Sequence, residues 1–266
     1  NAYRMDGLGN NFLIIDRRQD SLEINREKII DLANKKAFSF DQLIVLEKKE
    51  KNIFPITIFN PDGIEVTACG NGSRCIAYLI SQENKQKKIS IKTKERVLVA
   101  EIVGKQNVKI NMGKPKFSWK EVPLSESMNT KQVSIDLLGK EHGYGFCLNV
   151  GNPHIVFFIK DCSEIDIKKL GPEIENYRFF PERTNVTFAQ ILDKKNIKVN
   201  VWERGAGQTK ACGTAACASA VAASEQGLAD KNSNIHFKEG NLQIDYKEEI
   251  FMTGPVSEVS KIDLDI

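Results

Sequence analysis

The chain has 266 residues, enough for one large domain or two medium ones, each able to bury a core. Hydrophobic residues make up 41% of the sequence and charged residues 27%, the composition of an ordinary globular protein. With 38 basic and 35 acidic residues the net charge is only +3, which argues against nucleic-acid or membrane-surface binding because those functions favour a concentrated basic surface.

The start of the sequence and its cysteine content indicate a compartment. The first residues, NAYRMDGLGN, lack the charged and apolar regions of a signal peptide. Apolar runs all stay well short of the roughly 20 residues that cross a bilayer. Six cysteines are too few for a disulfide-stapled secreted domain. We therefore expect a cytoplasmic protein with reduced thiols and no membrane partner.

Short strands dominate the predicted elements. In the first half, apolar runs bounded by polar residues or glycine predict strands at 12–15, 43–46, 89–91, 97–103 and 108–111, and helical periodicity predicts helices at 26–37 and 73–84. The stretch 113–125, with two prolines and no clear period, is the predicted linker. The second half predicts strands at 145–150, 155–159 and 235–237 and a helix at 214–226, ended by Gly227.

Two segments, 53–80 and 197–223, resemble each other. Both read as an alternating apolar strand, a turn with glycine, the tripeptide Ala-Cys-Gly and an apolar helical run. Three pairs of landmarks recur at an offset of 142 or 143 residues: Asn10 with Asn152, Gln42 with Asn185, and Cys69 with Cys212. Such a repeat predicts two similar halves.

Together the elements and the repeat predict a mixed α+β fold. We expect two pseudo-symmetric domains, each a twisted, mostly antiparallel sheet around a central helix. The first domain is predicted to comprise residues 1–115 with the C-terminal residues 255–266, and the second residues 116–254.

Cys69 and Cys212 are each predicted to lie where a strand and a glycine turn lead into a helix. Unpaired N–H groups and the positive end of the helix dipole at that place lower the pKa of a thiol from about 8.5 and can seat a carboxylate. The small residues that follow leave the backbone open to a ligand: Gly70 with Asn71, and Gly213 with Thr214.

The remaining cysteines are expected to be buried structural thiols: Cys75, Cys147, Cys162 and Cys217. With three histidines and no close C-x₂-C pair, the sequence predicts no metal site. Two symmetry-related thiols suit the inversion of a stereocentre, because one group removes a Cα proton while the other returns a proton to the opposite face.

These residues lie in stretches that resemble the diaminopimelate epimerase family: MDGLGNNF, FDQL, FNPDGIEVTACGNGSRC, NVGNPH, ERTNV and ERGAGQTKACGTAAC. The resemblance implies a pyridoxal-free isomerase that needs no cofactor. It would interconvert LL- and meso-diaminopimelate for lysine and peptidoglycan precursor synthesis. It also implies an active site in the cleft between two pseudo-symmetric halves, and often a homodimer.

The resemblance further assigns roles. Cys69 and Cys212 would be the acid/base pair, with Cys69 the base toward the LL substrate. Gly70, Asn71, Gly213 and Thr214 would seat the reacting carboxylate, and Glu203 would pair with the α-ammonium. The distal end of the substrate would be read by Arg204 with Asn60, Asn152 and Asn185, while Asn10 and Gln42 resemble further pocket residues. His154 either supports the site or is a structural histidine, and Glu65 fits a solvated loop acid better than a supporting group.

Four positions depart from the family pattern: Asp6 stands for His, Asn11 for a frequent Asp, Gln208 for an acidic residue, and Ala215 for Gly. They affect none of the proposed catalytic groups. Two other readings stay open at this point. One is a proline or hydroxyproline racemase-type enzyme on the same scaffold, and the other is a non-catalytic amino-acid-binding protein. Arg204 and the asparagines favour a substrate with two zwitterionic ends, and a binder would need neither cysteine.

Overall fold

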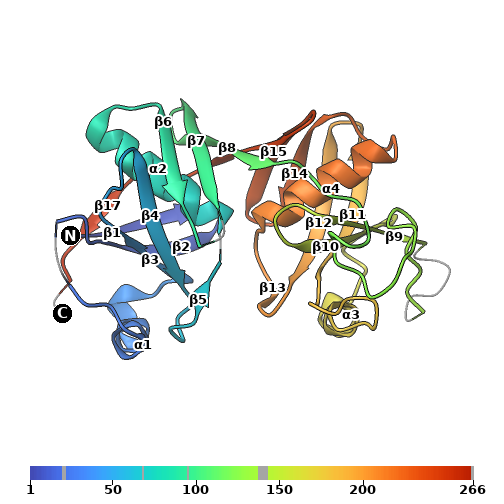
Figure 1. Ribbon diagram of the computed structural model, residues 1–266, viewed down its shortest axis with the longest axis horizontal. Helices are drawn as coiled ribbons and strands as arrows, with labels where there is room; N and C mark the ends of the chain where they lie inside the picture. Colours follow the sequence, from blue (N-terminus) through green and yellow to red (C-terminus); the bar gives the residue numbers. More distant parts are fainter. Residues whose placement is uncertain (20–21, 68, 95, 137–142, 265–266) are drawn as a thin grey trace. The chain divides into compact units, whose positions relative to one another are not determined.

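The computed structural model describes residues 1–266 except 20–21, 68, 95, 137–142 and 265–266. The chain forms two compact units (Figure 1): unit 1 comprises Asn1–Asn111 with Thr253–Ile266, and unit 2 comprises Met112–Met252. The chain leaves unit 1 within β8 (Asn107–Gly113) and returns to it within β16 (Ile250–Pro255). No described helix is long and apolar enough to cross a membrane.

Unit 1 is built on a mixed, mostly antiparallel sheet. Neighbouring strands pair antiparallel, except that β2 pairs with β3 and β4 pairs with β6 in parallel. Short strands complete it, with β5 on β4 and β17 on β1. The strands are β1 (Ala2–Gly7), β2 (Asn10–Asp16), β3 (Gln42–Leu46), β4 (Ile53–Phe59), β5 (Glu65–Val66), β6 (Lys88–Lys92), β7 (Val97–Gly104), the first part of β8, and β17 (Ser260–Ile262).

Two α-helices accompany this sheet. The first, α1 (Arg26–Asn34), packs Ile29 and Leu32 onto β2 and β3. It ends before the predicted residue 37 because Lys35 is extended, and the 3₁₀ turn η1 (Lys36–Phe38) follows. The second, α2 (Gly70–Asn84), packs on β1, β6 and β7 and is buried from Asn71 to Ser81, so it is the central helix of unit 1.

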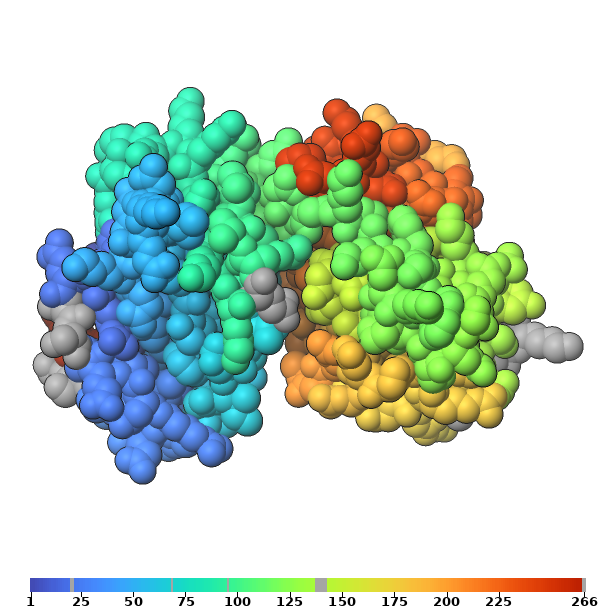
Figure 2. All heavy atoms as spheres, in the orientation of Figure 1, coloured from blue at the N-terminus to red at the C-terminus, as the bar shows by residue number. Residues whose placement is uncertain are grey.

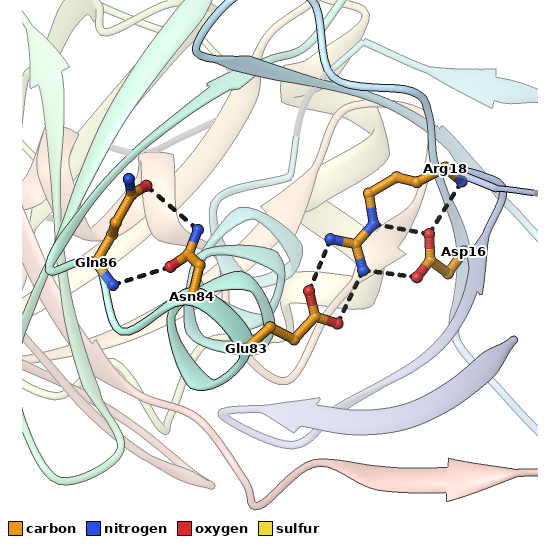
Figure 3. A network of polar contacts seen from close by, with 5 residues as sticks. All are labelled: Asp16, Arg18, Glu83, Asn84 and Gln86. Atoms are coloured by element: carbon orange, nitrogen blue, oxygen red, sulfur yellow. Dashed lines mark hydrogen bonds and ion pairs between the residues drawn. The ribbon is translucent and has the colours of Figure 1, made fainter.

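The C-terminal end of α2 is fixed by a charged network (Figure 3). Arg18, which follows β2, donates hydrogen bonds to both carboxylate oxygens of Asp16 and to both of Glu83 on α2. Charge-assisted, two-pronged pairs of this kind fix geometry better than single hydrogen bonds. The end of α2 remote from Cys69 is thereby tied to the sheet.

Unit 2 repeats the same order of elements. Its strands are β9 (Gly145–Asn149), β10 (Pro153–Phe158), β11 (Asn185–Asp193), β12 (Asn196–Glu203), β13 (Gly207–Gln208), β14 (Asn232–Phe237), β15 (Gly240–Tyr246) and the first part of β16. The parallel pairs are again the equivalent ones, β10 with β11 and β12 with β14. Its central helix, α4 (Gly213–Glu225), packs on β10, β11, β12 and β14, and α3 (Ile167–Glu175) lies between β10 and β11 in the chain.

The strand register carries the predicted repeat. Phe12 faces Gln42 in unit 1 as His154 faces Asn185 in unit 2. Likewise Leu43 faces Phe59 as Val186 faces Trp202. These partners differ by 142 or 143 residues, the offset read from the sequence, so the two halves share one topology, as predicted.

The stretch predicted as a linker, 113–125, begins just after the boundary between the units at Asn111 and Met112, but its second half contributes Val122 and Leu124 to the core of unit 2. Residues 114–136 contain no long strand or helix, yet Val122, Leu124, Val133 and Ile135 are buried in one cluster with Phe157 of β10. Figure 2 shows this segment, in bright green, spread over one face of unit 2. The prolines remove backbone donors without preventing the apolar side chains from packing.

Candidate active site

The two cysteines singled out by sequence are helix N-caps. Cys69 precedes α2 and Cys212 precedes α4, both in extended backbone conformation. The Sγ of Cys69 accepts a hydrogen bond from the Gly72 N–H at 3.4 Å, and the Sγ of Cys212 accepts one from the Ala215 N–H at 3.4 Å. Each thiol therefore lies at the positive end of a helix, as predicted.

Tight packing at the start of α2 explains one of the glycines. A Cβ added at Gly72 would lie 2.7 Å from Cδ1 of Ile44, on β3. Only glycine therefore lets the first turn of the helix approach the sheet without displacing that side chain. This close packing fixes the distance between β3 and the start of α2, where Cys69 is the N-cap.

Cys212 differs from the expectation in its pKa. Its residue is only 6% exposed, and burial, followed by the negative charge of Glu203, raises the pKa of the thiol well above 9.0. Hydrogen bonds from Thr214 and the Ala215 N–H act in the opposite direction but are outweighed. The helix terminus alone predicts a lowered pKa; that expectation is wrong for Cys212 because desolvation disfavours the thiolate more strongly.

The other four cysteines are buried, as predicted: Cys75, Cys147, Cys162 and Cys217. Burial raises the pKa of the thiol for Cys75, Cys147 and Cys162. Cys69 is by contrast partly exposed. The accessible thiol at a helix start in unit 1 is thus the one that the sequence singled out.

Glu203, at the end of β12, lies beside Cys212. The hydroxyl of Thr209 donates a hydrogen bond to its Oε1, and its carboxylate also shares a hydrogen bond with the Cys212 thiol. Burial raises the pKa of Glu203, while these two hydrogen bonds oppose that shift. Thr209 is a contact that the sequence analysis missed, although it lies in the same motif, ERGAGQTKACGTAAC.

Asn185 and Arg204 are held together through the backbone. Asn185 is 3% exposed; its Oδ1 accepts the N–H of Arg204 at 2.9 Å and its Nδ2 donates to the carbonyl of Pro153 at 2.8 Å. The guanidinium of Arg204 donates to the carbonyl of Glu182 at 3.0 Å. Asn185 thus braces the backbone at Arg204, a role that its sequence motif did not reveal.

His154 contacts Asn152. The Nε2 of His154 lies 2.8 Å from Oδ1 of Asn152. Burial, and secondly the positive charge of Arg204, lower the pKa of His154 to about 3, so the ring is neutral at physiological pH. A neutral ring that donates through Nε2–H fixes the side-chain amide of Asn152. His154 therefore touches a predicted substrate residue while being fully buried itself.

Two of the predicted residues of unit 1 are in contact: Gln42, at the start of β3, and Asn60, which follows β4. Gln42 donates through Nε2 to Oδ1 of Asn60 at 3.3 Å, and its own Oε1 is buried without a hydrogen-bond partner in the described part of the chain. Asn71 is buried, and its Oδ1 accepts a hydrogen bond from Arg74 at 2.9 Å.

Asp6, which stands where the family pattern has His, holds a turn of the backbone through hydrogen bonds. Its Oδ1 accepts the N–H of Gly9 at 3.0 Å, and its own N–H donates to the hydroxyl of Ser257 at 2.8 Å. Gly9 has a φ of +81°, which glycine adopts without strain, and Asn10 follows directly. Asp6 therefore stabilises the turn that presents Asn10.

Comparisons with known proteins agree with these motifs. The family model described as diaminopimelate epimerase matches residues 2–118 and 146–259. Diaminopimelate epimerase of Pelagibacter ubique (strain HTCC1062) is 43% identical over 268 residues, 99% of this chain and 98% of that protein.

Two solved structures share the fold. A phenazine biosynthesis protein of the PhzF family from Enterococcus faecalis matches with a TM-score of 0.69 at 11% identity, over 99% of this chain and 100% of that one. A probable proline racemase from Agrobacterium radiobacter K84 matches with a TM-score of 0.64 at 12% identity, over 99% and 93%. Identities this low show the fold alone, whereas the family model and the full-length relative identify the family. The chain belongs to the diaminopimelate epimerase family.

Proposed function

We propose that this protein interconverts LL- and meso-diaminopimelate, without a cofactor, for lysine and peptidoglycan precursor synthesis. The observation that carries the proposal is the matched placement of Cys69 and Cys212 as helix N-caps. The chain that holds them aligns over nearly its full length with the diaminopimelate epimerase of Pelagibacter ubique. A binding protein would not need two such thiols.

In the proposed reaction one thiolate takes the Cα proton and the other thiol gives a proton to the opposite face of the same carbon. Toward the LL substrate Cys69 is the base and Cys212 the acid. The raised pKa of Cys212 supports this assignment, because a thiol that stays protonated is ready to donate. The roles are exchanged in the reverse direction, and no net proton is consumed.

The carboxylate next to the reacting carbon is proposed to sit on backbone N–H groups at the two helix starts, at Gly70 with Asn71 and at Gly213 with Thr214. Negative charge that develops when Cα loses its proton spreads onto this carboxylate. Preorganised donors and the helix dipoles stabilise that charge. The same contacts would thereby bind the substrate and lower its barrier.

The remaining predicted residues are proposed to recognise the ammonium groups and the distal end. Glu203 accepts from the α-ammonium, and Arg204 with Asn60, Asn152 and Asn185 holds the distal zwitterion. Asn10 and Gln42 complete the site. The unpartnered Oε1 of Gln42 supports its inclusion, because a buried acceptor without a donor is costly until a ligand supplies one.

Hydrogen exchange tests the proposal directly. Reduced protein is incubated with LL-diaminopimelate in D₂O, without pyridoxal or metal, and the products are separated chirally and weighed by mass spectrometry. Deuterium at Cα of the meso product at a catalysed rate supports the proposal. Exchange with proline or hydroxyproline alone would favour the racemase-type alternative. Binding of an amino acid without exchange of any would favour a binding protein.

A homodimer stays a prediction of the resemblance, and a cytoplasmic location stays a prediction from the cysteine content and the start of the sequence. Light scattering coupled to gel filtration gives the mass of the particle and checks the first. The near-balanced net charge of +3 still argues against a nucleic-acid partner.

A further inference from the structure

A buried carboxylate, that of Glu175, contacts the segment that carries Glu203 and Arg204. Glu175 is the last residue of α3 and is 5% exposed. Its Oε2 accepts the indole N–H of Trp202 at 2.7 Å, and its Oε1 accepts the N–H of Gly205 at 2.9 Å and the guanidinium of Arg183 at 3.1 Å. One buried side chain thus receives three donors.

Two of these donors flank the proposed substrate residues. Trp202 comes immediately before Glu203, and Gly205 comes immediately after Arg204. The same carboxylate therefore fixes the chain on both sides of the Glu203–Arg204 pair. Gly205 has a φ of +75°, so the backbone turns sharply at the second anchor.

Packing reinforces the first anchor. A Cβ added at Gly171 of α3 would lie 2.5 Å from the Trp202 ring, so α3 approaches the indole as closely as a residue without a side chain allows. The helix, its carboxylate and the indole form one rigid support. Hydrogen bonds to an ionised, buried acceptor are stronger and more directional than ordinary ones.

We propose that Glu175 is a positioning residue for the reaction proposed above, setting where Glu203 and Arg204 meet the substrate without touching the substrate itself. Its two oxygens act on the backbone at Gly205 and on the side chain of Trp202. The inference rests on the proposed function of Glu203 and Arg204. It adds a residue to the site from outside the motifs that identify the family.

Glu175→Gln tests the role. The amide keeps the size of the side chain but turns one acceptor into a donor, which then faces an N–H of Trp202, Gly205 or Arg183. We expect kcat/KM for LL-diaminopimelate to fall about ten- to a hundredfold. A raised KM should account for a large part of this fall. Glu173→Gln, at an exposed position on the same helix, is the matched control and should keep wild-type kinetics.

The division of the effect between KM and kcat separates positioning from mere stability. If Glu175 only supported the fold, the remaining activity would follow the folded fraction measured by circular dichroism and KM would not change, which would overturn the proposal. Wild-type KM and kcat in a folded Glu175→Gln protein would overturn it as well. A wild-type protein that fails to turn over diaminopimelate would instead overturn the proposed function, so the two failures are distinguishable.

Trp202→Phe provides a second variant in case Glu175→Gln does not fold. Phenylalanine keeps an aromatic ring against Gly171 but removes the N–H donor, so one of the three hydrogen bonds is lost. We expect a rise in KM of a fewfold, smaller than in Glu175→Gln. An unchanged KM in the folded Trp202→Phe protein would contradict the proposal.

Discussion

Cys69 and Cys212 have the same local geometry: each is the N-cap of the central helix of its unit, and each Sγ lies 3.4 Å from the backbone N of the residue three places later. The hydrogen bond and the helix dipole both favour negative charge on sulfur. At Cys212 two effects disfavour the negative charge and raise the pKa of the thiol. The first is burial, which removes the thiol from water, and the second is the negative charge of Glu203 beside it. The two caps are alike in geometry but differ in their surroundings.

Cys69→Ala and Cys212→Ala should each slow epimerisation by at least about a hundredfold, because each removes one partner of the proton transfer. Chiral product analysis gives the rate, and circular dichroism checks the fold. Cys217→Ala, in the same helix as Cys212, is the matched control and should retain activity. Near wild-type turnover in either single cap variant would refute the two-base scheme.

Glu203→Gln should lower the pKa of the Cys212 thiol. The negative charge of Glu203 is the second cause of the raised pKa after burial, and the neutral amide removes that charge. The thiolate fraction at a given pH then rises, and alkylation of Cys212 by iodoacetamide becomes faster. Following the Cys212 peptide by mass spectrometry across pH gives the midpoint pH of its alkylation. Glu182→Gln, at an exposed position, should leave this midpoint unchanged. An unchanged midpoint in Glu203→Gln would contradict the effect of Glu203 on Cys212.

His154 should make the protein less stable in mild acid. Its pKa is about 3 when folded, against about 6.5 for a free histidine, so the unfolded chain takes up a proton that the folded protein does not. Stability from this group is complete above about pH 6.5 and is lost as the pH falls toward 3. Between pH 7 and 5 the loss is about 2 kcal/mol.

Urea unfolding at the two pH values measures this loss, and His154→Gln should remove it. If the free energy of unfolding changed equally between pH 7 and pH 5 in wild-type and His154→Gln protein, His154 would not be the group responsible.

Much of this architecture can be read from the sequence because its signals are local. The Ala-Cys-Gly tripeptides mark helix starts through the small residues that surround them, and the offset of 142 or 143 residues reveals two halves with one topology. The helix α3 was not predicted. It contains Gly171 and Pro172, both poor residues for a helix interior, and it forms because its apolar side packs on the core of unit 2 and on Trp202.

The contacts that organise the candidate site are mostly long-range. Glu175 meets Gly205 across 30 residues and Asn185 meets Arg204 across 19, separations at which a single sequence gives no pairing signal. The pKa of Cys212 was predicted in the wrong direction for the same reason, because its burial and the nearness of Glu203 depend on tertiary packing. Motifs locate the reacting groups, and packing decides their electrostatics.

Asn185→Ala should weaken both the fold and the recognition of the substrate. It leaves the carbonyl of Pro153 and the N–H of Arg204 without their partner in a buried place, which costs about 1–3 kcal/mol in the free energy of unfolding. Asn176 is the matched control, because its side chain also donates to a proline carbonyl, that of Pro172 at 2.8 Å, but at an exposed position where water replaces the bond. Asn176→Ala should therefore change stability by less than about 0.5 kcal/mol.

Urea unfolding compares the two variants, and kinetics with LL-diaminopimelate follow for folded protein. Because Asn185 holds the backbone from which the Arg204 side chain extends, KM should rise in Asn185→Ala and stay unchanged in Asn176→Ala. Equal losses of stability in both variants would show that burial of the Asn185 amide does not set its contribution. A wild-type KM in folded Asn185→Ala would show that the hydrogen bond between Asn185 and Arg204 stabilises the fold but does not affect substrate recognition.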